Sequence, residues 1–190
     1  MTEITFPALL AVFSGIWLVV RIFFWCRQGR IDWKRELQLL WVYLCTVVVL
    51  RLTFFPFSRV DGQIQPLVFD PGRMVPPRIN VLPFVYLIDY PTVREILLNV
   101  IGNSVLFLPY GIVFPIVFRR LDTPGKIIAA GIGTSLGIEL LQLPFFDRVS
   151  DIDDLILNTV GYLAGYAILH CVRNRRQKAN HKKKQEITKS

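Results

Sequence analysis

The stretch that decides the fold runs from Gly131 to Gly165 and reads GIGTSLGIELLQLPFFDRVSDIDDLILNTVGYLAG. It includes most of two apolar segments, residues 126–145 and 152–172, and the connection between them. Each segment is long enough to cross a membrane. Charged side chains lie inside and between these segments, although one charge at the centre of a bilayer costs about 2.5–3.5 kcal/mol. The stretch therefore predicts membrane helices that carry a polar site.

The polar residues of this stretch recur at helical spacing. Glu139 and Gln142 are three residues apart and share one helix face. Asp151, Asp154 and Asn158 step by three and four residues, so they share a face as well. A solvated hairpin loop would explain the polar residues between the two segments equally well. Glu139 favours a buried site, because it lies inside the apolar run and cannot easily reach water.

Glycines repeat at four-residue spacing in both segments, at Gly133 and Gly137 and again at Gly161 and Gly165. Small residues at this spacing let membrane helices approach closely. We expect the two segments to pack through these glycines. Their acids and amides would then point into one protein-lined pocket.

The composition is typical of a membrane protein. Hydrophobic residues make up 53% of the chain and charged residues 19%, and the mean hydropathy is +0.45. The net charge is +8, but residues 173–190 hold eight Lys or Arg against one Glu, so this tail supplies +7 of it. A basic tail after an apolar helix predicts a cytoplasmic anchor for anionic inner-leaflet lipid. No interleaving of aromatic and basic residues supports nucleic-acid binding.

We expect an all-α integral membrane bundle of about five transmembrane helices. The predicted spans are residues 6–26, 37–57, 94–118, 126–145 and 152–172. The proline-rich stretch 58–92 argues against a continuous helix, and its apolar piece 79–88 is too short to span, which favours a re-entrant or interfacial segment. The tail from about Asn174 is expected to be disordered or a frayed helix end.

The charge distribution predicts the orientation. With five spans, the basic loops at 27–35 and 119–126 and the basic tail lie on one side, and such loops are cytoplasmic. The N-terminus is then outside and the C-terminus cytoplasmic. The polar residues of several segments fall together in the outer half of the bundle: Arg51, Asn80, Arg94, Asn99, Asn103, Glu139, Gln142, Arg148, Asp151, Asp153, Asp154 and Asn158.

Two sets of these polar residues allow more than one interpretation. Arg51 either reaches the membrane interface or pairs with a buried acid, and we prefer pairing because Glu139 has no nearby cation in its own helix. Arg21, at the end of the first span, is expected to reach the interface. Asn99 and Asn103 are four residues apart and are expected mainly to form bonds between helices.

These residues together resemble the VanZ-like family. The similarity covers residues 37–172, with a first helix and loop at 1–36 and the tail at 173–190 outside it. It rests on these pieces: Arg51 with Phe55-Pro56-Phe57, Asn80 to Phe84, Asn99 to Gly111, Glu139 with Gln142, Arg148, and Asp151 to Gly161. The resemblance implies an all-helical, multi-pass protein of the bacterial cell membrane. One member of the family is associated with low-level resistance to the glycopeptide teicoplanin, and no reaction is firmly assigned to the family.

The first hypothesis is therefore a binding protein without a cofactor. Its outward-facing polar pocket would hold a headgroup of a membrane lipid, a lipid-linked cell-wall precursor or a glycopeptide, and so alter the cell envelope and teicoplanin susceptibility. Arg51, Arg94 and Arg148 would pair with phosphate. The predicted binding residues are Arg51, Asn80, Asn99, Asn103, Glu139, Gln142, Arg148, Asp151, Asp154 and Asn158.

The alternative is a membrane enzyme acting on a lipid-phosphate substrate. Glu139, Asp151, Asp153 and Asp154 would hold a divalent cation, and Glu139 is the candidate general acid or base. Against this, both histidines lie on the predicted cytoplasmic side, away from any nucleophile of the site. A transporter is less favoured because no internal repeat is present. A purely architectural polar cluster, which only locks the helices together, stays open.

Overall fold

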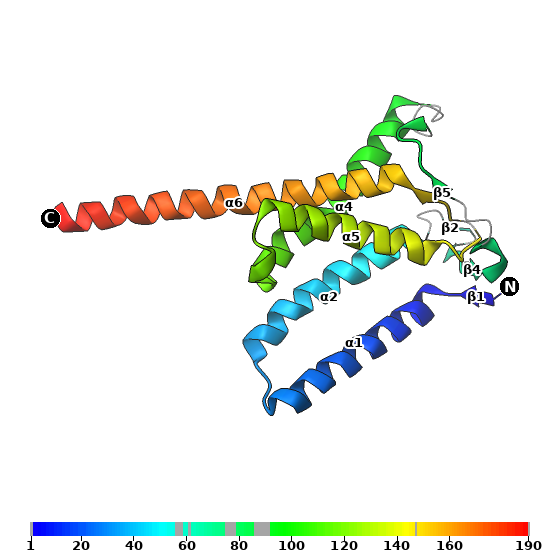
Figure 1. Ribbon diagram of the computed structural model, residues 1–190, viewed down its shortest axis with the longest axis horizontal. Coiled ribbons are helices and arrows are strands. Elements are labelled where there is room, and N and C mark those ends of the chain that lie inside the picture. The colour runs from blue at the N-terminus through cyan, green and yellow to red at the C-terminus, as the bar shows by residue number, and fades with distance from the viewer. Residues whose placement is uncertain are drawn as a thin grey trace. The chain divides into compact units, whose positions relative to one another are not determined.

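The computed structural model describes residues 2–55, 59–60, 62–74, 79–85, 92–146 and 148–189. The described part is dominated by five α-helices, which confirms the all-α prediction. Figure 1 shows them in chain order as α1 (Phe6–Gln28), α2 (Trp33–Phe54), α4 (Val93–Val117), α5 (Pro124–Gln142) and α6 (Ile152–Lys189).

Four of these helices are long and apolar enough to cross a membrane: α1, α2, α4 and the part of α6 over Ile152–His181. Helix α5 is not among the four, although we expected a span there. It has only 19 residues, and it carries Lys126 and Glu139 among several glycines and alanines, which lowers its hydropathy. The expected number of helices is therefore correct, but α5 has the weakest membrane-spanning character.

The chain divides into two compact units. The first comprises Met1–Tyr90 and Gly133–Leu155, and the second comprises Pro91–Ile132 and Ile156–Ser190.

The first unit begins with a helical hairpin. Helix α1 ends because Gly29 adopts a left-handed conformation, with φ of 66°, and its N–H bonds to Trp25 O. Helix α2 then begins four residues earlier than expected, because the Asp32 side chain accepts the N–H of Arg35 as an N-cap. The two helices are joined by a hydrogen bond of 2.8 Å between the hydroxyls of Ser14 and Tyr43.

Short strands, which we did not predict, complete the first unit. Strand β1 (Thr2–Ile4) pairs antiparallel with β4 (Leu67–Phe69), and β2 (Arg59–Val60) pairs with β3 (Gln63–Ile64) across Gly62, whose φ is 75°. A 3-10 helix, η1 (Pro71–Met74), follows β4. Strand β5 (Ile79–Asn80) pairs in parallel with β6 (Ser150–Asp151). The pairing of β5 with β6 matters most, because it brings two predicted site segments together.

The second unit is built on close contact between α4 and α6. A Cβ atom at Gly161 would lie 2.0 Å from Ser104 O, and one at Gly165 would lie 2.1 Å from Leu108 O. On the other helix, a Cβ at Gly111 would lie 2.0 Å from Tyr162 O. Only glycine lets the two backbones meet at this distance.

This contact corrects the expected partner of the glycines. The three atoms nearest to a Cβ at Gly161 or Gly165 belong to α4, and not to the preceding apolar segment as we predicted. A Cβ at Gly133 or Gly137 would meet no described atom within 4 Å outside its own helix. The four-residue spacing therefore predicted a helix contact correctly at Gly161 and Gly165, but not at Gly133 and Gly137.

Aromatic rings fill the space beside these glycines. The ring of Tyr162 is fully buried and stacks on Tyr110 at 5.5 Å between centroids. Phe107 and Phe114 approach the same ring at 6.1 and 5.8 Å. A short 3-10 helix, η2 (Arg119–Leu121), follows α4.

The basic tail is helical, whereas we expected it to be disordered or frayed. Helix α6 continues without interruption to Lys189. No Gly or Pro follows Gly165, and Lys, Arg, Gln and Ala have high helix propensity. Near its beginning the tail is fixed by Arg173, whose Nη1 donates to Asp122 Oδ2 at 2.6 Å.

Candidate functional site

Most predicted site residues lie in the first unit, and three of them bind the end of α2. The last carbonyls of a helix have no partner within the helix. Here Gln142 Nε2 donates to Thr53 O at 2.7 Å, and Arg148 Nη2 donates to Phe54 O at 2.6 Å. Two predicted ligand residues, from α5 and from the connection after it, therefore cap α2.

Arg51 has the same role from within α2. Its Nη1 donates to Phe55 O at 3.1 Å, and its guanidinium lies 5.8 Å from the centre of the Phe6 ring. The expected ion pair with Glu139 is not formed, since the ion pairs of the described residues do not include it. Our preference for pairing was wrong, because the unpartnered carbonyls at the end of α2 provide a closer acceptor.

The acidic start of α6 binds the segment after β5. Asp151 directly precedes α6, and its Oδ1 accepts the N–H of Asp153 at 2.9 Å, as an N-cap does. The same oxygen accepts Asn80 Nδ2 at 3.0 Å. Asp153 is 4% exposed, and its Oδ1 accepts the N–H of Phe84 at 2.8 Å. The Asn80–Phe84 motif and the aspartates thus form one hydrogen-bonded structure.

Phe84 has a strained backbone in this structure. Its φ of 64° lies in the left-handed region, where a bulky side chain costs about 1–2 kcal/mol. Phe84 is 51% exposed, and its neighbours Val81 and Leu82 are 68% and 62% exposed. An apolar tip held in this way fits the expected interfacial segment, whose remaining residues, 86–88, lie outside the described part.

Glu139 belongs to the same cluster. It is 3% exposed, and its Oε2 accepts the N–H of Asp151 at 2.9 Å. It also interacts electrostatically with Asp154, which in turn interacts with Asp153 and Arg148. Four carboxyl groups thus gather with one guanidinium. We define the acidic site as Glu139, Arg148, Asp151, Asp153 and Asp154.

The three remaining predicted residues lie in the second unit. Asn158 is 3% exposed on α6. Asn103 Nδ2 lies 3.5 Å from Asn99 Oδ1 on α4, which is a long distance for a hydrogen bond. These three amides belong to the second unit and are not among the residues of the acidic site. Arg94, at the start of α4, is exposed.

Sequence reasoning missed the main-chain groups that the polar side chains bind. The carbonyls of Thr53, Phe54 and Phe55 and the N–H of Phe84 carry no signature in their residue types. The end of α2 was expected at Phe57, and residues 56–58 lie outside the described part. One signal would have indicated this capping: Arg51 lies four residues before Phe55, close enough for its side chain to reach the carbonyls at the end of α2.

The acidic site does not favour the metal-dependent alternative. Within the described residues no three His, Cys, Asp or Glu side chains converge closely enough to hold a metal ion. Instead, the Asp151 and Asp153 carboxylates each accept hydrogen bonds from protein N–H groups, which positions the start of α6.

The helices and the polar site define a class: an all-helical membrane protein with buried carboxyl groups at the ends of its helices. The VanZ/LLP1 family matches residues 40–173, which is well over half of the chain, and the chain belongs to this family. No curated protein and no solved structure matches it significantly.

Proposed function

We propose that this chain is a non-enzymatic protein of the bacterial cell membrane that binds a polar headgroup at the acidic site. Through that binding it would lower susceptibility to teicoplanin-type glycopeptides. The observation that carries the proposal is the gathering of four carboxyl groups with one guanidinium, at least two of them almost fully buried. Buried ionisable groups in membrane proteins are costly, and they commonly mark a ligand site.

The charge of the site favours a cationic group on the ligand. Arg51 and Arg148, which we expected to hold phosphate, donate to carbonyls of α2. The carboxyl groups outnumber the single guanidinium of the acidic site, and carboxylates bind ammonium groups through short, charge-assisted hydrogen bonds. We infer that the ligand presents an amine, carried by a membrane lipid or by a lipid-linked cell-wall precursor.

The proposal places the acidic site on the outer side of the membrane. This orientation requires α5 to cross, because the basic loop before it and the acidic site after it must then lie on opposite sides. The three native cysteines are free, so a cysteine-free background with Val149→Cys gives a single reporter beside the site. Val149 is 47% exposed.

A membrane-impermeant maleimide should label this reporter in intact cells. The matched control keeps only the native Cys171, which is exposed and lies towards the basic tail; it should react only after the cells are permeabilised. Labelling of Val149→Cys only after permeabilisation would place the site in the cytoplasm and refute the outward-facing site.

Drug susceptibility tests the function itself. Glu139→Gln and Asp153→Asn remove a charge but keep an oxygen that can accept the N–H of Asp151 or Phe84. Cells expressing either variant should be as sensitive to teicoplanin as cells without the protein, while protein level and melting temperature stay close to wild type.

The matched control is Glu95→Gln, which makes the same chemical change at an exposed position on α4. It should keep the wild-type tolerance. If Glu139→Gln and Asp153→Asn also keep full tolerance, the carboxylates are not needed for function and the proposal fails. If they instead unfold the protein, the cluster is architectural.

A further inference from the structure

The helical hairpin of α1 and α2 lines an open pocket, which shares no residue with the acidic site. Its volume is about 510 Å³, which lies within the usual range of ligand sites. The lining is almost entirely apolar and includes three tryptophans, Trp17, Trp25 and Trp33. Apart from Leu40, every lining residue precedes the part of the chain that matches the family, so this pocket is an addition to the family's region.

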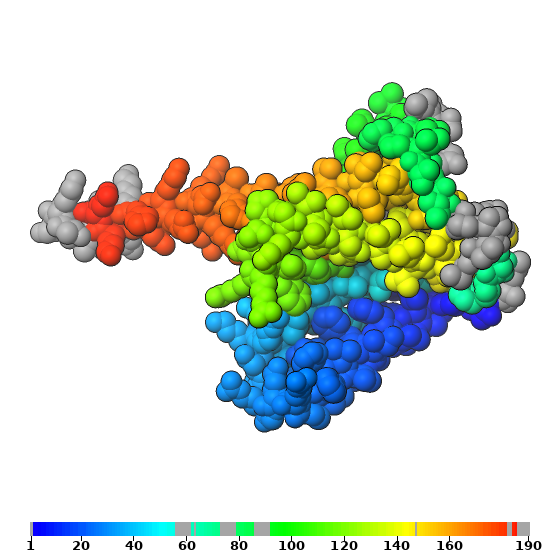
Figure 2. Space-filling model, viewed as in Figure 1, coloured from blue at the N-terminus to red at the C-terminus, as the bar shows by residue number. Residues whose placement is uncertain are grey.

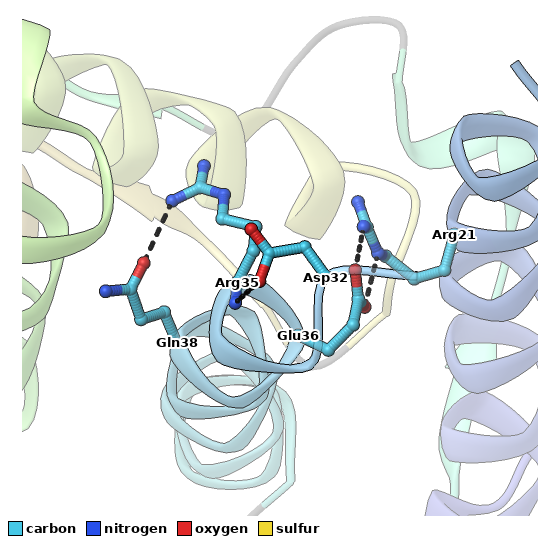
Figure 3. A network of polar contacts seen from close by, with 5 residues as sticks. All are labelled: Arg21, Asp32, Arg35, Glu36 and Gln38. Atoms are coloured by element: carbon cyan, nitrogen blue, oxygen red, sulfur yellow. Dashed lines mark hydrogen bonds and ion pairs between the residues drawn. The ribbon is translucent and has the colours of Figure 1, made fainter. Parts of the chain in front are cut away.

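One ion pair holds the hairpin together beside this pocket. Figure 3 shows Arg21 of α1 facing Glu36 of α2, and Arg21 Nε donates to Glu36 Oε2 at 2.9 Å. We expected Arg21 to reach the membrane interface instead. Because the pair neutralises both side chains, it leaves an apolar pocket with no net charge of its own.

The loop at the mouth of the hairpin is strongly basic. Arg27, Arg30 and Lys34 are exposed, and Arg35 is half-buried, with its Nη1 3.4 Å from Gln38 Oε1. The loop's one acid, Asp32, caps α2. Four cations against one carboxylate give the loop a clear positive charge, directly beside an apolar pocket.

We propose that this pocket takes an acyl chain of an anionic phospholipid, whose phosphate-bearing headgroup contacts Arg27, Arg30 and Lys34. Tryptophans gather at membrane interfaces, where an apolar ring meets polar headgroups. Basic clusters next to a membrane helix attract anionic lipid. The apolar lining thus suits the acyl chain, the tryptophans suit the interface between chain and headgroup, and the basic loop suits the phosphate.

The side chains of α1, none of which is buried, form the exposed blue surface in Figure 2.

Tryptophan fluorescence of the full-length protein provides the test. All four tryptophans, at 17, 25, 33 and 41, lie on α1 and α2, and three of them line the pocket. The purified protein is placed in phosphatidylcholine vesicles, and phosphatidylglycerol with brominated acyl chains is added as the quencher. It should quench at about tenfold lower concentration than brominated phosphatidylcholine.

Two charge variants separate the hairpin from the rest of the surface. The triple variant Arg27→Gln, Arg30→Gln, Lys34→Gln should lose the preference for phosphatidylglycerol. The control removes the same charge from exposed positions in η2 and at the start of α5 with Arg119→Gln, Arg120→Gln and Lys126→Gln, and it should keep the preference. Equal loss in both variants would mean that only net charge matters, and the proposal would fail.

A third variant tests the pocket itself. Leu40→Phe adds volume to the lining, so it should reduce quenching by brominated phosphatidylglycerol while the variant still binds the same vesicles. Unchanged quenching would show that the acyl chain lies elsewhere. Tryptophans that neither lipid quenches would show that another occupant, such as a second copy of the chain, fills the pocket, and this too would overturn the proposal.

Discussion

The two units of this protein use opposite means to bring helices together. In the second unit, α4 and α6 meet through glycines, so closely that a Cβ atom would overlap a carbonyl oxygen, and buried aromatic rings fill the space beside them. In the first unit, helix ends meet through side-chain hydrogen bonds to main-chain groups. The contact between α4 and α6 is apolar and does not tolerate added side-chain volume. The contacts in the first unit are polar and weaken when a hydrogen-bond donor is removed.

This difference separates scaffold from candidate site. Close backbone contact in a membrane helix pair needs only small residues and no charge. The first unit, in contrast, contains four carboxyl groups at positions where apolar side chains would cost less free energy. Part of that polarity is explained by capping, since Gln142, Arg148 and Arg51 satisfy the last carbonyls of α2. The carboxyl groups of the acidic site do not bind the carbonyls of α2, and their gathering around one guanidinium is why we assign a ligand to them.

The largest expected effect is on the glycine contact. Gly161→Ala places a Cβ atom 2.0 Å from Ser104 O, a main-chain atom that cannot move aside alone. We expect a loss of about 3 kcal/mol in unfolding free energy, at the upper end of the usual cost of overpacking, because the added Cβ atom forces the backbones apart. Reversible unfolding of the purified protein in mixed micelles with a denaturing detergent measures it.

Gly137→Ala is the matched control, since a Cβ there meets no described atom within 4 Å beyond its own helix. It should be neutral or stabilising by up to about 1 kcal/mol, from the higher helix propensity of alanine. Equal destabilisation by both changes would contradict the assignment of Gly161 to the α4–α6 contact.

A smaller effect is expected at the polar cap of α2. Arg148→Met keeps the length of the side chain but removes the donor to Phe54 O, so this carbonyl loses a partner. We expect destabilisation by about 1–3 kcal/mol in the same unfolding assay. Arg120→Met, at an exposed position, should change stability by less than about 0.5 kcal/mol. A neutral Arg148→Met would show that the cap contributes nothing.

The sequence alone predicted the elements with strong local signals. Four of the five helices follow from long apolar runs, and their existence needs no tertiary information. The buried position of Glu139 was also predictable, because a carboxyl group inside an apolar run has few other places to go. The short strands were not predictable, because two- and three-residue strands form only where distant segments happen to meet.

Partners were harder to predict than positions. Glycine spacing is the same at Gly133/Gly137 and at Gly161/Gly165, and only the second pair touches another backbone. Arg51 has an acid in the same unit, and yet it binds the carbonyl one helical turn away. Both errors have one cause: a sequence states which groups need a partner, whereas the fold decides which partner is nearest.

The claim that the acidic site binds an amine-bearing headgroup is tested most directly by the lipids that co-purify with the protein. Wild type and the double variant Glu139→Gln, Asp153→Asn are taken from the same cells into lipid nanodiscs and analysed by native mass spectrometry. We predict that wild type retains an amine-bearing lipid or lipid-linked precursor above its share of the membrane, and that the double variant retains it only at that share. The account is contradicted if both proteins carry bulk lipid in bulk proportions.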